Sequence, residues 1–159
     1  MINIRLGKIE DLLQLNQDWA WGKEDWAREN QQKVIKDSKD GTHSFLVVED
    51  NNKVIGELHI IWNQKEDQDE ANGKDRAYLS TLRLHPNYRE KGIGTKLMKA
   101  ALKHIKEKGF IQATIGAYTH EQHIQTLYKK WGFTKQIKEC TEKLGENETT
   151  YILLIQRLF

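Results

Sequence analysis

The stretch Arg89-Glu90-Lys91-Gly92-Ile93-Gly94 has the residue types of an anion-binding loop. It follows an expected strand and opens directly into a helical run. The first N–H groups of a helix have no partners within the helix, and the helix dipole adds partial positive charge at the same place. Gly92 and Gly94 would let an anion approach the main chain, while Arg89 and Lys91 supply charge near it. These features predict a pyrophosphate site; the alternative is a strand-to-helix turn that binds nothing.

Two further motifs flank this loop. The run Tyr78-Leu79-Ser80-Thr81-Leu82-Arg83-Leu84-His85-Pro86 precedes it, and Leu127-Tyr128-Lys129-Lys130-Trp131-Gly132-Phe133 follows it. In this order and spacing, the three segments resemble the GNAT N-acetyltransferase superfamily over about residues 54–133. The resemblance implies a mixed α/β fold (GNAT fold): a central, mostly antiparallel sheet of about six to seven strands with a splayed parallel pair, and helices on both faces. It also implies acetyl-CoA as co-substrate, without a metal.

The resemblance assigns roles to individual residues. In the family, the pantetheine arm enters between two splayed parallel strands, so the main chain of Leu82 to Leu84 would pair with it. The amides from Glu90 through Thr95 would hold the pyrophosphate, and the hydroxyl of Tyr128 would protonate the departing thiolate. The implied cofactor-binding residues are Leu82, Arg83, Leu84, Arg89, Glu90, Lys91, Gly92, Ile93, Gly94, Thr95, Glu121 and Tyr128.

The general base is the point at which this sequence departs from its relatives. Many of them place a carboxylate two residues before the Leu-x-Leu step, where this chain has Ser80, or twelve residues before the tyrosine, where it has Gly116. Glu121 replaces an asparagine that is frequent in the family, and Ile124 replaces a small residue. These changes affect the acceptor side of the expected site, not the CoA side.

Four other residues could take a proton from the amine, directly or through water. Glu57 and His59 share one face of an expected strand because side chains alternate with a period of two. His120 and Glu121 precede an expected helix. Histidine is suited to the role because its unperturbed pKa lies near 6.5, although a lone histidine is more often structural. A chain of water molecules to bulk solvent is an equally good answer.

The implied activity is transfer of an acetyl group from acetyl-CoA to a primary amine by direct attack, with a small molecule as the preferred acceptor. Such a reaction needs no covalent enzyme nucleophile. We therefore interpret Cys140 as a small buried hydrophobic residue. The alternatives are a protein or peptide acceptor, or a catalytically silent acyl-CoA-binding module. The missing carboxylates favour a silent module, and the intact Tyr128 argues against it.

Hydrophobic periodicity and turn residues predict the order β-α-α-β-β-β-α-β-α-β-β. The hairpin turn Asp50-Asn51-Asn52 should join the second and third strands, and Gly109 should end the long helix. The expected strands are 2–6, 44–49, 53–62, 78–85, 110–117, 133–140 and 150–158. Four helices are expected: the first begins near 8–11, the second ends near 37, the third covers 92–108 and the fourth covers 121–131.

Two segments have no clear role in this pattern. Three tryptophans (Trp19, Trp21 and Trp26) surround Gly22 and could form a wall of an acceptor pocket or attach the connection to the core. Residues 63–76 are polar and indicate a solvated excursion whose charges have no partner, with a place at the mouth of the acceptor site as the alternative.

Composition narrows the class of protein. The 159 residues fit a single domain, 1–159, and carry a net charge of +2, so no global field favours nucleic acid. No apolar run approaches the ~20 residues that span a bilayer. A single cysteine excludes an internal disulfide, and the first residues lack the apolar core of a signal peptide. We expect a cytoplasmic protein, monomeric or homodimeric, with no nucleic-acid or membrane partner.

Overall fold

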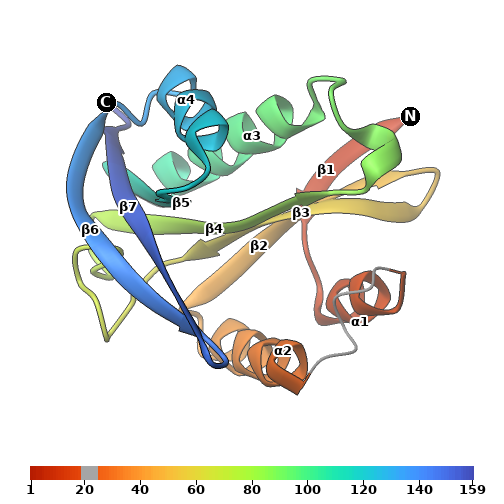
Figure 1. Cartoon of the computed structure of the whole chain (residues 1–159). Helices are drawn as coiled ribbons and strands as arrows, with labels where there is room; N and C mark the ends of the chain where they lie inside the picture. Colours follow the sequence, from red (N-terminus) through yellow and green to blue (C-terminus); the bar gives the residue numbers. More distant parts are fainter. Residues whose placement is uncertain (19–24) are drawn as a thin grey trace. The chain divides into compact units, whose positions relative to one another are not determined.

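The strands and helices follow one another in the predicted order (Figure 1). The computed structural model describes the backbone of residues 1–18 and 25–159, and their side chains except those of 16–18, 25–29 and 144. The tryptophan side chains that could form a wall of an acceptor pocket lie outside this described part.

The elements are β1 (Ile2–Leu6), α1 (Ile9–Asp18), α2 (Asp25–Lys39), β2 (His43–Asp50), β3 (Lys53–Ile61), β4 (Arg76–Leu84), the short 3₁₀ helix η2 (Pro86–Tyr88), α3 (Ile93–Glu107), β5 (Gln112–Tyr118), α4 (Gln122–Lys130), β6 (Lys135–Leu144) and β7 (Asn147–Arg157).

The seven strands form a mixed sheet in the order β1-β2-β3-β4-β5-β7-β6. Its parallel pair is β4 with β5, while β1/β2, β5/β7 and β6/β7 are antiparallel. The predicted fold class, including the parallel pair, is confirmed. Residue contacts divide the chain into two units, Met1–Ile60 with Thr81–Ala101 (unit 1) and Ile61–Ser80 with Leu102–Phe159 (unit 2). The expectation of one domain stays a prediction.

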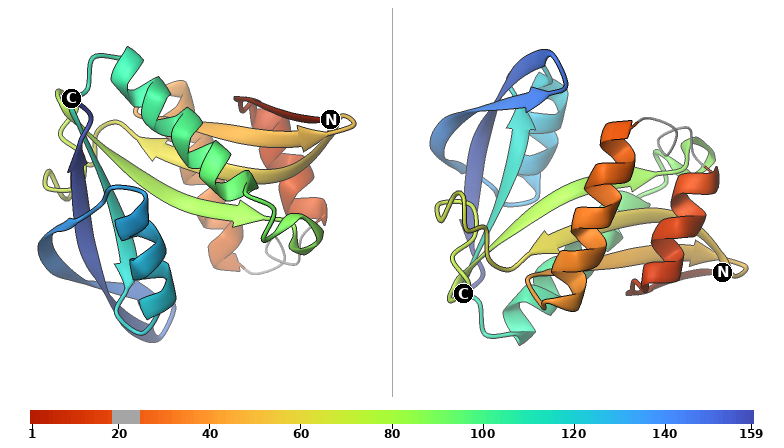
Figure 2. Two further views of the ribbon diagram at one scale, coloured as in Figure 1. Left: turned by 90° about the horizontal axis from the view of Figure 1, so that it is seen from above. Right: turned by 90° about the horizontal axis from the view of Figure 1, so that it is seen from below.

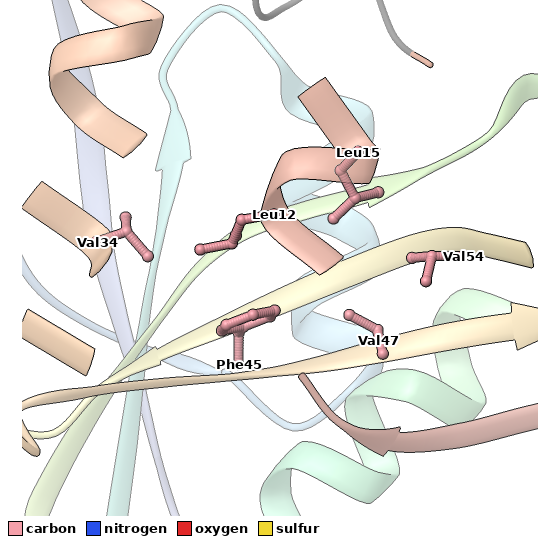
Figure 3. Packing of buried hydrophobic residues seen from close by; sticks show 6 residues of the cluster. All are labelled: Leu12, Leu15, Val34, Phe45, Val47 and Val54. Atoms are coloured by element: carbon pink, nitrogen blue, oxygen red, sulfur yellow. The ribbon is translucent and has the colours of Figure 1, made fainter. Parts of the chain in front are cut away.

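The core of unit 1 lies between strands β2 and β3 and helices α1 and α2. Leu12 and Leu15 of α1 and Val34 of α2 point toward the sheet, where Phe45, Val47 and Val54 meet them (Figure 3). All six are at least nine-tenths buried. Within this unit, the first turns of α3 cover the opposite face of the strands from α1 and α2 (Figure 2). Helices therefore lie on both faces, as predicted.

The β2–β3 hairpin turns at Asn51 and Asn52, which have φ angles of 51° and 67°. Two successive left-handed residues are typical of the type I′ turn, whose twist matches that of the flanking strands. Asparagine adopts this conformation more readily than most residues. The predicted hairpin is confirmed, and its second strand positions Glu57 and His59.

Unit 2 is built on β5, which pairs with β4 on one side and β7 on the other. Helix α4 packs against β5. The β6–β7 hairpin is longer than expected, because β6 extends to Leu144 and β7 begins at Asn147. Alternating polar and apolar residues are absent near this turn, so periodicity could not define where β6 ends and β7 begins. The consequence is that Tyr151 lies well inside a paired strand, opposite Cys140 and Tyr118.

The segment between β3 and β4 contradicts the expectation of a solvated excursion without partners. Glu70 and Ala71 are buried, and Lys138 of β6 forms ion pairs with Asp67 and Asp69. Asn72 Oδ1 accepts hydrogen bonds from three successive backbone N–H groups, those of residues 74–76. Composition alone suggested exposure, but side-chain capping and ion pairs hold this segment in place.

No helix within residues 1–18 and 25–159 combines the length and the apolar character that crossing a bilayer requires.

Helix α3 ends where Gly109 was predicted to end it. Gly109 has a φ of 89°, and its N–H donates to Lys106 O at 3.0 Å, while Phe110 N–H donates to Ile105 O at 3.3 Å. These two bonds form a Schellman motif, which satisfies the last carbonyls of the helix. An added Cβ at Gly109 would meet nothing within 4 Å, so glycine is required by the backbone angle alone.

We predict that Gly109→Ala lowers the free energy of unfolding by about 1 kcal/mol, because an L-residue costs roughly 1–2 kcal/mol in the left-handed conformation. Chemical denaturation of both proteins measures the difference. Lys108→Ala, at the neighbouring exposed position, is the matched control and should cost less. An equal loss in both variants would contradict this explanation of the helix end.

Candidate functional site

Strand β4 carries a left-handed residue in its middle. Thr81 has a φ of 55°, which is strained for a β-branched residue and persists only where the surrounding structure holds it. The parallel ladder with β5 ends two residues earlier, at the pair Leu79↔Ile115. A left-handed residue inside a strand also breaks the alternation of faces. Leu82 and Leu84, which follow Thr81, are both only partly buried.

The predicted anion-binding loop connects β4 to α3 within unit 1. After η2, Glu90 and Gly92 adopt φ angles of 64° and 77°, and α3 begins at Ile93. The first α-helical hydrogen bond runs from Lys96 N–H to Gly92 O, so the amides of Ile93 and Gly94 precede that ladder. A left-handed turn followed by first-turn amides forms a concave set of N–H groups that favours an anion.

Side chains around this loop fix it to β4 and to the β2–β3 hairpin. Arg89 Nε donates to Leu84 O at 3.2 Å, and Tyr88 Oη donates to Asp50 at 2.9 Å. Lys91 Nζ lies 5.9 Å from the centre of the Tyr88 ring. An added Cβ at Gly92 would meet no atom within 4 Å. Glycine at this position is therefore required by the backbone turn, not by crowding within the chain.

Glu57 and His59, two of the candidate bases, belong to a buried hydrogen-bond network in unit 1. His59 Nε2 lies 2.5 Å from Glu57 Oε1, and His43 Nε2 lies 2.8 Å from His59 Nδ1. Arg83 Nε donates to Glu57 Oε2 at 2.7 Å, and Arg83 Nη2 donates to the same oxygen. The ring of Phe45 stacks on His59 with centroids 5.0 Å apart. The network joins β2, β3 and the part of β4 that follows Thr81.

The charges in this network are compensated internally. Burial raises the pKa of the Glu57 carboxyl, but the hydrogen bond from His59 and the charges of His59 and Arg83 outweigh burial, so the pKa lies below its usual value. Burial lowers the pKa of His43 to about 3, so its ring is neutral at pH 7. His59 Nε2 can donate to Glu57, and His59 Nδ1 lies at hydrogen-bond distance from Nε2 of the neutral His43. This arrangement satisfies both oxygens of Glu57.

The outer end of the network opens onto a cavity. Its volume is about 180 Å³, and His43 and Phe45 are among its lining residues together with Leu6, Gly7, Ile9, Ser38 and Ser44. His43 is the only one of the four network residues in that lining. Water in this cavity could exchange protons with His43, whereas Glu57 is shielded by its two partners.

Tyr128, the expected acid, lies on α4 in unit 2. Its ring stacks on Trp131 and meets Phe133 edge to face, with centroids 5.8 and 6.5 Å apart. Burial, with a smaller contribution from the charge of Glu121, raises the pKa of Tyr128 to about 12. The phenol therefore keeps its proton at neutral pH and can donate it.

The other two candidate bases precede α4. Glu121 occupies the N-cap position without a side-chain capping bond, and its carboxylate lies 3.8 Å from His120 Nε2. The His120 ring stacks on Tyr118 with centroids 5.6 Å apart. Both side chains reach solvent, so they could exchange protons with water directly. The structure thus groups the predicted residues as Glu57, His59, Arg83 and the anion-binding loop in unit 1, and His120, Glu121 and Tyr128 in unit 2.

Two features of the sequence receive a structural explanation. An added Cβ at Gly116 would lie 2.8 Å from both Tyr78 Oη and Tyr151 Cδ2, so tyrosine side chains fill the space beside this residue. Cys140 is only partly buried, not fully as expected. Burial raises the pKa of its thiol, which disfavours a thiolate nucleophile.

Sequence reasoning missed several buried polar groups, among them His43 and Glu70. A period of two indicated that His43 shares a face with Phe45, but only the strand pairing brings it to His59. Glu70 lies in a segment whose composition suggested exposure, and no sequence signal marked it. Among the residues with described side chains, no group of three or more His, Cys, Asp or Glu is arranged to hold a metal ion.

A family model described as "Acetyltransferase (GNAT) family" matches residues 8–133. The chain belongs to the GNAT family. Among curated proteins, N-acetyltransferase 8F1 of Rattus norvegicus is 27% identical over 92 residues, which cover 58% of this chain and 40% of that protein. The chain thus matches less than half the length of this relative.

Solved structures of GNAT acetyltransferases share the fold over nearly the whole chain. The Elizabethkingia anophelis GNAT acetyltransferase with acetyl-CoA bound has a TM-score of 0.68 and 18% identity, covering 98% of this chain and 97% of that chain. The Escherichia coli ribosomal-protein-S18-alanine N-acetyltransferase has a TM-score of 0.75 and 14% identity, covering 99% and 94%. The Thermoplasma acidophilum PaiA N-acetyltransferase in complex with coenzyme A has a TM-score of 0.67 and 21% identity, covering 99% of each chain.

We predict that Glu57→Ala lowers the free energy of unfolding by about 3 kcal/mol, because removing one partner of a buried ion pair leaves the other charge uncompensated. Urea denaturation provides the measurement. Lys33→Ala breaks the exposed ion pair with Asp37, at 2.6 Å on α2, and should cost at most about 0.5 kcal/mol. If the two variants lose the same stability, Glu57 does not hold Arg83 in the way described.

Proposed function

We propose that this GNAT protein transfers an acetyl group from acetyl-CoA to a primary amine, with a small-molecule acceptor preferred. The observation that carries the proposal is the left-handed Thr81, which follows the last rung of the β4–β5 ladder. A strand that leaves its neighbour exposes backbone groups to which an extended chain can bind as an added strand. The pantetheine arm of CoA is such a chain, and it carries amide groups.

The proposed cofactor contacts are mainly with backbone atoms. The main chain of Leu82, Arg83 and Leu84 would pair with the pantetheine arm, and the first-turn amides of α3 would hold the pyrophosphate. Arg89 and Lys91 are exposed beside this loop and add positive charge. This division explains why Arg83 can use its side chain to bind Glu57 while its backbone remains assigned to the cofactor.

The chemistry requires a neutral amine that attacks the thioester carbonyl. The carbon–nitrogen bond forms, the carbon–sulfur bond breaks, and the leaving thiolate takes up a proton. We assign this proton to Tyr128, whose phenol remains protonated because its pKa is raised to about 12 by burial and by Glu121. Proton donation by a positioned side chain contributes roughly 10²- to 10⁴-fold to a rate.

The four candidate bases differ in their suitability. Both oxygens of Glu57 are engaged by His59 and Arg83, and its lowered pKa makes it a weak base. His59 is buried between Glu57 and His43. His120 and Glu121 reach solvent and are the more accessible pair. We therefore assign Glu57 to the positioning of Arg83.

Binding and turnover of the wild-type protein test the proposal. Calorimetry should show a higher melting temperature with acetyl-CoA, because a ligand at 100 times its Kd stabilises the folded state by about 2.7 kcal/mol. Gly94→Glu should abolish this shift by placing a side chain and a negative charge at the first turn of α3. Arg89→Ala should weaken binding only partly, since the backbone amides remain. An unchanged transition of the wild-type protein at millimolar acetyl-CoA would refute the proposal.

Thiol release from acetyl-CoA, measured with a panel of small amines and of peptides, identifies the acceptor class. Release with small amines supports the preferred acceptor. Release with peptides alone would reverse that preference. The peptides are included because the Escherichia coli ribosomal-protein-S18-alanine N-acetyltransferase has a similar fold. Binding of acetyl-CoA without release for any amine would favour a catalytically silent binding module.

We predict that Tyr128→Phe lowers the turnover number by about 10²- to 10⁴-fold and leaves KM for acetyl-CoA near the wild-type value. The substitution removes one oxygen and keeps the ring that packs on Trp131 and Phe133. Tyr118→Phe is the matched control and should retain activity. Unchanged turnover in Tyr128→Phe would show that the thiolate takes its proton from another source.

A further inference from the structure

Glu70 is a buried carboxylate in the segment between β3 and β4. It is only 6% exposed, and Tyr151 Oη donates a hydrogen bond to its Oε1 at 3.1 Å. Its second oxygen, Oε2, is buried and has no hydrogen-bond partner among the described residues. Its backbone carbonyl accepts a bond from Thr114 Oγ1 at 2.6 Å. Tyr151 and Thr114 therefore hold Glu70 against the sheet, while Oε2 of its carboxylate accepts no hydrogen bond from the described residues.

An unsatisfied oxygen in a buried carboxylate is costly, because burial without hydrogen bonds penalises the ionised form. Burial accordingly raises the pKa of Glu70. Its segment is fixed independently, by the capping bonds of Asn72 and by the ion pairs of Lys138 with Asp67 and Asp69. A glutamine at this position could keep the bond to Tyr151 without a buried charge. A carboxylate buried at this cost suggests a chemical role.

The partner of Glu70 lies beside the point where the parallel strands separate. Gly116 directly follows Ile115, which forms the last rung of the β4–β5 ladder. The Tyr151 ring occupies the space that a Cβ at Gly116 would take, 2.8 Å from that position, and Tyr78 Oη lies equally close to it. Thr114, which binds the carbonyl of Glu70, is two residues earlier on the same face of β5. Within unit 2, these contacts place the Glu70–Tyr151 pair next to the end of the ladder.

We propose that Glu70 accepts the proton that the acceptor amine must lose, with Tyr151 as the relay between them. This inference rests on the proposed acetyl transfer. The acceptor enters as its ammonium form. One of its N–H bonds breaks and that proton moves to Tyr151 Oη, while the Tyr151 hydroxyl proton moves to Glu70 Oε1, which leaves a neutral amine. The nitrogen keeps the electron pair and attacks the thioester. The second proton that nitrogen loses balances the one that the thiolate takes up, and Glu70 returns its proton to solvent between turnovers.

The proposal explains how the chain can act without a carboxylate at Ser80 or Gly116. Two tyrosines fill the space beside Gly116, and a carboxylate from another segment stands behind one of them. Glu57 is also a buried carboxylate, but three donors from two residues satisfy it. The number of donors thus distinguishes the two glutamates.

The pH dependence of activity follows from the groups that face Glu70. Burial disfavours the charged form of Glu70, as do the charges of Asp67 and Glu142, whereas the hydrogen bond from Tyr151 and the charge of Lys138 favour it. Only ionised Glu70 accepts a proton, so activity should rise with pH through its raised pKa and then reach a plateau. The titratable groups that interact with Glu70 are Asp67 on the same segment, Tyr78 on β4, Lys138, Cys140 and Glu142 on β6, and Tyr151 on β7.

The decisive variant is Glu70→Gln, measured in the full chain with the preferred amine. We expect kcat to fall by about 10²-fold or more, the acidic limb of the pH–rate profile to disappear, and the acetyl-CoA-dependent shift in melting temperature to persist. The melting temperature without ligand should be equal or higher at pH 7, because the variant removes an incompletely satisfied buried charge. Lower activity together with undiminished stability is not expected from a purely structural residue.

Two further variants complete the test. Tyr151→Phe keeps the ring beside Gly116 and should reproduce the loss of kcat. Glu142→Gln alters a similar pair, in which Tyr118 Oη donates to Glu142 at 2.9 Å, and should keep the wild-type plateau. Full activity of Glu70→Gln with an unchanged pH profile would overturn the inference. An inactive wild-type protein that fails to bind acetyl-CoA would instead refute the proposed function itself.

Discussion

The strained backbone of Thr81 is the constraint on which the candidate site depends. A threonine in the left-handed region is held there only if neighbouring contacts stabilise it. Before Thr81, β4 pairs with β5; after it, Arg83 turns its side chain to Glu57, and His85 N–H donates to Ile55 O of β3 at 2.8 Å. Strand β4 therefore keeps its bond to β3 where its ladder with β5 has ended. The buried ion pair fixes the segment to which the cofactor is assigned.

The same strand links the ion pair to the anion-binding loop. Arg89 donates to Leu84 O at 3.2 Å, and Tyr88 binds Asp50 at the end of β2. The loop is thus positioned by backbone and side-chain contacts from its own unit before any ligand arrives. Preorganised N–H groups bind an anion without a large ordering cost, since the turn and the helix start are already formed. Residues far apart in the sequence act together here because β4 carries both.

Sequence reasoning was most reliable where one local signal determined the structure. Asn51 and Asn52 indicated the hairpin, Gly109 indicated the end of α3, and the period of two placed Glu57 beside His59. It was least reliable where the determining contact is distant. Nothing in a threonine predicts a left-handed angle, so sequence patterns did not indicate the irregular backbone at Thr81. The burial of Glu70 depends on Thr114 and Tyr151, which lie 44 and 81 residues away.

The two buried glutamates show how one residue type can serve opposite purposes. Glu57 receives hydrogen bonds from His59 and Arg83 on both oxygens, and its pKa is lowered despite burial. Glu70 receives one hydrogen bond on its side chain, from an uncharged phenol, and burial raises its pKa. A carboxylate with a lowered pKa holds its charge and stabilises a fold, whereas one with a raised pKa takes up a proton more readily. Stability and proton uptake therefore require opposite environments, and this chain separates them between two residues.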